Sequence, residues 1–277
     1  MTSGMSTIRT RRGRSLAPRQ VIRALLLVGL IVSALGPLLL LVLWSVSGRW
    51  LYPALLPTQL DLGGWRALRA GTTWLALLTS AALASATGVV GCALALPLGR
   101  ALSRVHGWRR HVGAAAAFLP VAAPPLALGT GLQVVLLSAG LGGTATGVFL
   151  AHLVPAVGYL ALFFLGTFTL FDARVEAEAR TLGATPWQTW RYVLLPLLRT
   201  PIAEAVALGF LISWSQFALT LVIGGGAVRA LPLEVFAFVR AGEDRAAAVS
   251  ALLLVVPPVM ALAALRWAAR RTAVVPA

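Results

Sequence analysis

Charged residues are scarce in this chain: only 11% of its 277 residues are Asp, Glu, Lys or Arg, whereas an average soluble domain carries about 25%. Hydrophobic residues make up 59%, and the mean hydropathy is +0.88. So few charges cannot cover the surface of a soluble protein of this length. The composition therefore indicates a protein that lies largely in lipid.

Lysine is absent, so all 23 basic residues are arginines. A P-loop nucleotide site needs a lysine after its glycine-rich loop, so we do not expect this chain to bind ATP in that way. With Cys92 as the only cysteine and with three scattered histidines, we expect neither a disulfide nor a metal site. No nucleophile lies beside a base in the sequence, and we expect no catalytic residues and no cofactor.

The net charge of +15 raises the possibility of a nucleic-acid partner. The arginines, however, lie in short clusters between apolar stretches, as is typical of residues that flank a membrane. The lipid bilayer is therefore the expected partner, and nucleic acid is not.

Six apolar stretches are long enough to span a bilayer, which takes about 20 residues. They cover roughly residues 24–44, 74–98, 112–138, 146–170, 202–223 and 246–267. The first is too long for the apolar region of a signal peptide, about 7–15 residues, and we interpret it as a retained anchor. Prolines in the third and sixth predict kinks. A transmembrane domain thus covers 24–271, between a basic tail at 1–23 and a short tail at 272–277.

Arginines are distributed unequally between the two sides of the membrane. If both termini are cytoplasmic, 17 arginines lie inside and six lie outside. The positive-inside rule therefore predicts an all-α, multi-pass protein of the cytoplasmic (inner) membrane, with about six transmembrane helices and both ends inside.

The cytoplasmic segment 172–198, between the fourth and fifth stretches, carries the signals of a helix that ends in a defined turn. Asp172 is placed to cap its start, and Glu176 and Arg180 form a favourable i,i+4 pair. Gly183 stands where a glycine commonly ends a helix in the left-handed conformation.

A second helix is expected directly after this turn. Thr185 is a capping residue, Pro186 suits the first helical position, and Gln188 completes a capping box. Together these signals predict a short cytoplasmic helix of about ten residues held at both ends. An amphipathic helix lying on the membrane is the alternative, but the thin apolar stripe and mixed charges favour insertion into a groove of a partner protein.

The same segment resembles the EAA loop of binding-protein-dependent (type I) ABC importer permeases, whose pattern is E-A-A-x3-G-x9-I-x-L-P. Gly183 matches the glycine, Val193 replaces the isoleucine, and 195–196 match Leu-Pro. The E-A-A positions hold Ala177-Glu178-Ala179, with Glu176 one place earlier. The residues that the resemblance implies in coupling to an ATPase are Glu176, Glu178, Ala179, Gly183, Leu195 and Pro196.

The resemblance extends over about 74–267 and is strongest to the permeases for polyamines, iron(III), thiamine, phosphonate, sulfate and molybdate. It implies that the chain forms the translocation path for a small polar or charged solute such as a polyamine, iron(III), phosphonate or thiamine. It also implies a cytoplasmic coupling helix between spans four and five, and three kinds of partner. These are an ABC ATPase dimer that hydrolyses the ATP, a second identical or homologous permease, and an extracytoplasmic solute-binding protein.

Polar residues inside a span are costly, which makes them candidates for function. Ser213, Gln216 and Thr220 lie in the fifth stretch at helical spacing, and we interpret them either as lining the translocation path or as hydrogen bonds between helices. His152 and Gln133 are lone polar residues, and we expect each to make a helix–helix contact.

Two other functions remain as alternatives. An ATP-independent secondary transporter or channel favours internal repeats and a buried carboxylate, but no repeat is visible and Glu204 is the only acid within a stretch. We expect Glu204 to pair with Arg199 or to reach the interface. A membrane-embedded enzyme needs convergent His or carboxylate side chains, which are too few here.

Overall fold

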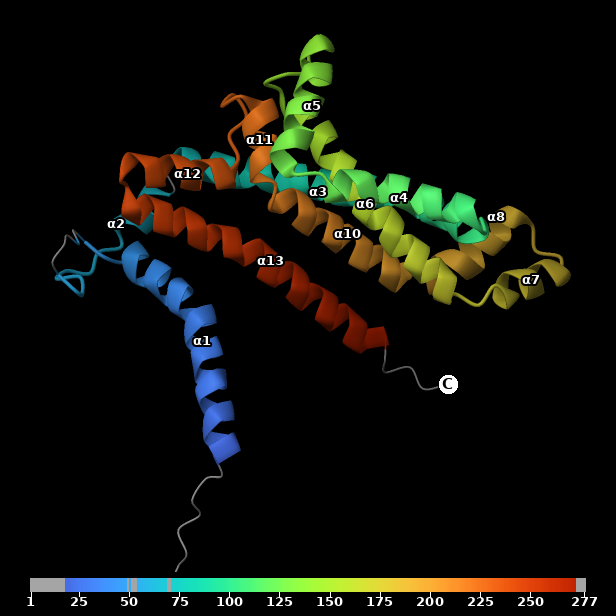
Figure 1. Ribbon diagram of the computed structural model, residues 1–277, viewed down its shortest axis with the longest axis horizontal. Coiled ribbons are helices and arrows are strands. Elements are labelled where there is room, and N and C mark those ends of the chain that lie inside the picture. The colour runs from blue at the N-terminus through green and yellow to red at the C-terminus, as the bar shows by residue number, and fades with distance from the viewer. Residues whose placement is uncertain (1–17, 49, 51–53, 69–70, 273–277) are drawn as a thin grey trace, which may run out of the picture.

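A computed structural model describes residues 18–48, 50, 54–68 and 71–272, which form helices joined by turns (Figure 1). The long continuous helices are α1 (Pro18–Ser45), α3 (Thr72–Arg104), α6 (Ala145–Leu170) and α13 (Asp244–Thr272). The shorter ones in the bundle are α2 (Gly63–Ala67), α4 (Trp108–Ala122), α5 (Pro125–Ser138), α10 (Arg199–Trp214), α11 (Phe217–Gly224) and α12 (Leu231–Ala241). Of the two predicted tails, residues 1–17 and 273–277 lie outside the described residues.

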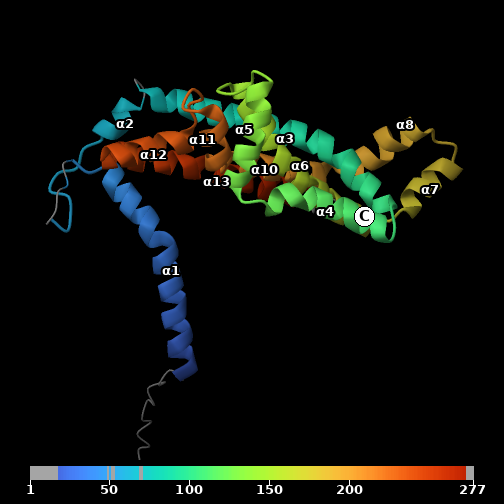
Figure 2. The ribbon, with the colours of Figure 1, turned by 45° about the horizontal axis from the view of Figure 1, so that its top comes forward.

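The core of the bundle lies where α3, α6 and α10 pack together. On α6, Leu160, Ala161 and Phe164 are fully buried. Small residues allow α3 to approach α10 closely: a Cβ placed on Gly88 would lie 2.5 Å from the carbonyl oxygen of Val206. The apolar part of α1, by contrast, is not buried by the rest of the chain, and α1 diverges from the bundle (Figures 1 and 2).

Among the described residues, four helices are long and apolar enough to span a membrane, and two bent pairs of helices bring the total to as many as six. The third predicted stretch is more than kinked. It divides into α4 and α5, which meet at 97°. The chain turns at Pro124 and Pro125. Because Pro125 has no backbone N–H, it cannot continue the hydrogen bonds of α4, and it occupies the first position of α5, where no such bond is needed.

The fifth predicted stretch, 202–223, is not one continuous helix. The helix ends at Trp214, Gln216 adopts a non-helical ψ of 88°, and α11 begins at Phe217. Ser213 and Thr220, on either side of this break, hydrogen-bond to His152 of α6. The sixth stretch is helical through Pro257 and Pro258 and starts two residues earlier than predicted, at Asp244.

Candidate coupling segment and polar cluster

The cytoplasmic segment begins with α7 (Arg174–Thr181). The carboxylate of Asp172 accepts a hydrogen bond from the backbone N–H of Arg174 at 2.9 Å, so it satisfies an N–H at the start of the helix. The helix has eight residues, slightly fewer than the expected ten. It begins close to the end of α6, and its other end points away from the bundle (Figure 1).

The turn at Gly183 has the geometry that its sequence predicts. Gly183 has a φ of +86°, and its N–H donates to the carbonyl of Arg180 at 3.0 Å. The N–H of Ala184 donates to the carbonyl of Ala179 at 3.1 Å, which completes a Schellman motif. A glycine suits this position because the left-handed conformation places a Cβ against the backbone.

The predicted capping box of the second helix is confirmed. α8 (Pro186–Gln188) starts after Thr185, whose hydroxyl accepts from the N–H of Gln188 at 3.3 Å, while the Gln188 side chain accepts from the N–H of Thr185 at 2.8 Å. A π-helical stretch, η1 (Thr189–Leu194), and α9 (Leu195–Leu197) then lead into α10. Both ends of the turn are thus fixed by hydrogen bonds.

The candidate coupling residues lie in different surroundings. Glu176 is half-buried against α3, whereas Glu178 is exposed. Ala179 and Leu195 are half-buried, and Gly183 and Pro196 are exposed; Leu195 and Pro196 are in α9. Since residues two apart on a helix point about 200° apart, Glu176 and Glu178 face opposite sides of α7.

The carboxylate of Glu176 binds arginine side chains on two elements. Nη2 of Arg100 and of Arg104, one turn apart on α3, lie 2.9–3.1 Å from its oxygens, and Nη2 of Arg180 lies 2.6 Å away. The Glu176–Arg180 pair was predicted. Burial alone would raise the pKa of Glu176, but the charges and hydrogen bonds of Arg100 and Arg104 outweigh it and hold that pKa below its usual value.

In the sequence, Arg100 and Arg104 are recognisable only as positive charges that flank a membrane span. Their i,i+4 spacing puts them on one face of α3, but the sequence does not say which segment that face meets. The long-range contact with Glu176 needs the folded bundle.

A second group of polar residues lies within the membrane-spanning part. His152 of α6 is 2% exposed, and its ring contacts the hydroxyl of Ser213 through Nδ1 at 2.8 Å and that of Thr220 through Nε2 at 3.0 Å. Gln216 lies at the break between α10 and α11, and its carbonyl accepts a hydrogen bond from the Thr220 hydroxyl at 2.6 Å. The imidazole therefore holds together the two halves of a broken helix.

The other polar residues singled out in the sequence lie apart from this cluster. Gln133 of α5 donates to the carbonyl of Val222 in α11 at 3.0 Å, a helix–helix contact as predicted. Glu204 is exposed near the start of α10 and, within the described residues, forms no ion pair with Arg199.

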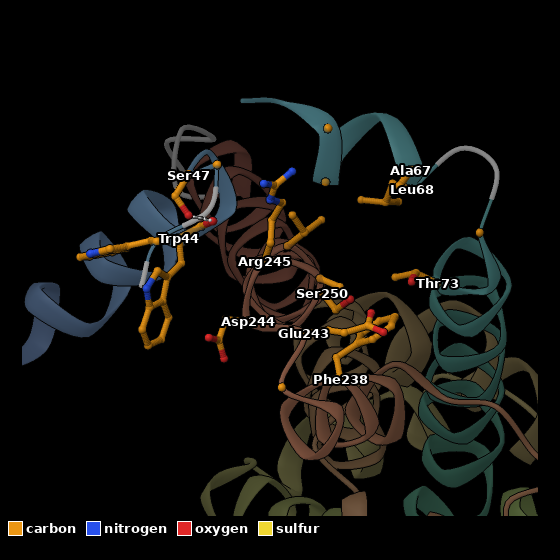
Figure 3. Close-up of a pocket in the computed structure, with 18 of the residues that line it drawn as sticks. Trp44, Ser47, Ala67, Leu68, Thr73, Phe238, Glu243, Asp244, Arg245 and Ser250 are labelled. Atoms are coloured by element: carbon orange, nitrogen blue, oxygen red, sulfur yellow. Dashed lines mark hydrogen bonds between the residues drawn. The ribbon is translucent and has the colours of Figure 1, made fainter. Parts of the chain in front are cut away.

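The end of the molecule opposite to α7 holds a cleft of about 750 Å³ between α1, α2, α3 and α13. Figure 3 shows its side chains, among them Thr73 of α3 and Ser250 of α13. An ion pair between Asp61 and Arg245, 2.8 Å long, joins the segment before α2 to α13 beside it. No motif in the sequence pointed to this cleft.

In sequence, the chain is similar to proteins named as transport system permeases. Residues 89–273 match the family described as binding-protein-dependent transport system inner membrane component. The chain is 30% identical over 213 residues to the molybdenum transport system permease protein ModB of Mycobacterium tuberculosis, covering 72% of this chain and 81% of the relative. It is 27% identical over 241 residues to PhnV of Salmonella typhimurium, named as a 2-aminoethylphosphonate transport system permease, covering 85% and 89%.

Among solved structures, the fold is similar to a chain of a bacterial ABC transporter involved in the import of the acidic polysaccharide alginate. The TM-score is 0.68 at 13% identity, and the match covers 94% of this chain and 97% of that one. A second structure of the alginate transporter, in complex with an alginate pentasaccharide-bound periplasmic protein, matches with a TM-score of 0.69 over 93% and 96% of the two chains.

Replacing His152 with Ala should lower the free energy of unfolding in lipid nanodiscs by about 1–2 kcal/mol, and with it the midpoint temperature of unfolding. The reason is that the buried hydroxyls of Ser213 and Thr220 lose their hydrogen bonds to the imidazole ring. His106→Ala is the matched control, since His106 is exposed. A midpoint of unfolding equal for both variants would show that the cluster does not hold the broken helix together.

Proposed function

Since this chain belongs to the family of binding-protein-dependent transport system inner membrane components and is thus a multi-pass permease of an ABC importer, we propose that its α7–α8 segment docks on a separate cytoplasmic ATPase. The observation that carries this proposal is the turn at Gly183, fixed on one side by a Schellman motif and on the other by a capping box. A segment held so firmly outside the bundle transmits force instead of deforming.

The surface around this turn supports a protein partner. Leu182 is 88% exposed and Trp187 is 69% exposed, on either side of Gly183. Large apolar side chains that are exposed together on a polar, cytoplasmic segment are typical of a protein-binding surface. A short helix with this pattern fits the groove of a partner.

The energy source belongs to that partner in our proposal. A chain without lysine has no P-loop lysine to contact the phosphates of ATP. We propose that a dimer of ATPase subunits hydrolyses the ATP and moves the segment, and that this movement changes the side of the membrane to which the permease opens.

We further propose that the translocation path forms between two permease chains. The cavity beside His152, Ser213, Gln216 and Thr220 measures about 10 Å³, enough for one water molecule at most. A solute therefore needs a wider passage, which a second identical or homologous chain would provide. Gln216 is half-buried at the helix break, and in our proposal it lines that passage, with Ser213 and Thr220 behind it.

A solute-binding protein completes the proposed importer. The alginate transporter, whose fold this chain shares, was solved with a periplasmic protein that carries its solute. The cleft in Figure 3 lies at the end of the molecule opposite to α7, where such a protein would dock.

For the solute itself, we propose a small oxyanion. Two of the relatives are named for molybdenum and for 2-aminoethylphosphonate, and molybdate and phosphonate are both oxyanions. Glu204 is the only carboxylate in the six apolar stretches, whereas the polar cluster consists of hydroxyls, an amide and an imidazole. The side-chain amide of Gln216, which faces the proposed passage, can donate hydrogen bonds to an anion, and a path for polyamines or iron(III) would favour acidic residues instead.

Docking can be tested by co-expressing the tagged chain with its ATPase and measuring how much ATPase copurifies. We expect the double variant Leu182→Ser with Trp187→Ser to lower capture by about tenfold or more, because it removes the exposed apolar contacts. Leu55→Ser is the matched control, since Leu55 is 92% exposed far from this turn. Equal capture by both variants would contradict docking at α7–α8.

The solute class can be tested in proteoliposomes that contain the complete importer, with ATP inside and the binding protein outside. We expect ATP-dependent uptake of molybdate or 2-aminoethylphosphonate and none of spermidine. Uptake of spermidine in preference to both oxyanions would overturn the proposed solute class but leave the docking proposal standing.

A further inference from the structure

The cytoplasmic end of α3 and the coupling helix α7 are joined through one carboxylate. Glu176 accepts hydrogen bonds from Arg100 at 2.9 and 3.0 Å and from Arg104 at 3.0 and 3.1 Å. Arg100 and Arg104 occupy the last turns of α3, where cations are also favoured by the helix dipole. Arg180 contacts the same carboxylate from within α7.

This contact is more protected from water than an ordinary surface ion pair. The side chain of Glu176 is 15% exposed and that of Arg100 is 22% exposed. The Arg100 guanidinium also lies over the ring of Trp190, 5.0 Å from its centroid, so η1 packs against the pair as well. Hydrogen bonds between charged groups in such surroundings are stronger than exposed ones.

The charges of the cluster are unequal. Arg100, Arg104 and Arg180 carry three positive charges around the single negative charge of Glu176. Without the carboxylate, three guanidinium groups would face one another across the contact and would push α7 away from α3.

Glu178 lies on the other side of α7 and is exposed, as are Leu182 and Trp187 next to the turn. The two carboxylates, two residues apart, therefore have different surroundings. Glu176 binds arginines of α3, and Glu178 faces outward.

We propose that Glu176 is a positioning residue that links the coupling helix to span α3, and that Glu178 is the carboxylate that meets the ATPase. This inference rests on the proposed docking of α7–α8. When the docked helix moves, Glu176 pulls on Arg100 and Arg104 and so displaces α3. A permease that lacks this contact still binds its ATPase, but α3 no longer moves with the docked helix.

The packing of α3 explains how such a displacement reaches the rest of the molecule. Gly88 brings α3 against the backbone of α10, so the two helices move together. At the far end, Ser80 accepts a hydrogen bond from the N–H of Leu231 at 2.8 Å, and the Thr72 hydroxyl donates to Glu234. Both of these partners lie in α12, whose Phe238 lines the cleft of Figure 3.

The internal link can be tested in the full-length chain alone, in nanodiscs, with Cys92 replaced by Ala and a spin label on Thr181→Cys. We expect Glu176→Gln to increase the mobility of the label more than Arg100→Gln does, because Arg104 still holds Glu176 when Arg100 is replaced. The double variant should increase mobility no further than Glu176→Gln alone, because the contact of Arg100 is already lost with the carboxylate. Glu178→Gln is the matched control and should leave mobility unchanged. Unchanged mobility in Glu176→Gln, or additive effects in the double variant, would overturn the link.

The division of roles is tested in the complete importer. Glu176→Gln should retain capture of the ATPase but lower solute uptake on the order of tenfold, whereas Glu178→Gln should lower capture itself. Loss of capture in Glu176→Gln, or full uptake with it, would overturn the inference. If the unaltered chain captures no ATPase, the docking proposal fails and the inference about Glu178 fails with it, while label mobility still decides whether Glu176 joins α7 to α3.

Discussion

Inside a bilayer, each backbone or side-chain polar group has to find its partner within the protein, because no water is available to replace it. This constraint explains why interrupted helices in the bundle are accompanied by specific polar contacts. At the break between α10 and α11, the carbonyl of Gln216 accepts from Thr220 and the carbonyl of Ser213 accepts from the N–H of Gln216. His152 then binds the hydroxyls on both sides of the break.

Outside the hydrocarbon the constraint relaxes, and a different set of interactions shapes the chain. The segment after α6 is held by caps, by a left-handed glycine and by charges. Its exposed face carries Glu178, Leu182 and Trp187, and its inner face carries Glu176. The same short element thus has one surface suited to a partner and another fixed to α3. This arrangement is what a part that transmits movement requires.

Local chemistry explains which features could be predicted from the sequence. The turn at Gly183 and the capping box at Thr185 depend on residues within five positions of each other, and both are confirmed. Long apolar stretches likewise predicted helices α1, α3, α6 and α13 to within a few residues at most ends. The family resemblance placed the segment in a permease, and the match over 89–273 supports that assignment.

The features that could not be predicted depend on contacts between distant parts of the chain. The residues on both sides of the break at Gln216 hydrogen-bond to His152, more than 60 residues earlier. Likewise, Arg100 binds Glu176, 76 residues later. A hydropathy pattern also cannot distinguish a kinked span from two helices at 97°, because both contain the same apolar residues. The cleft between α1 and α13 is formed by segments from opposite ends of the chain.

We propose the α7–α8 segment as the surface through which the permease engages its ATPase. Hydrogen exchange of the permease in nanodiscs, measured with and without added ATPase, tests this proposal. We expect slower exchange of the backbone amides in residues 178–187 when the ATPase is present, with no comparable change around α2 and α12. Unchanged exchange in residues 178–187, with protection at another cytoplasmic segment, would contradict it.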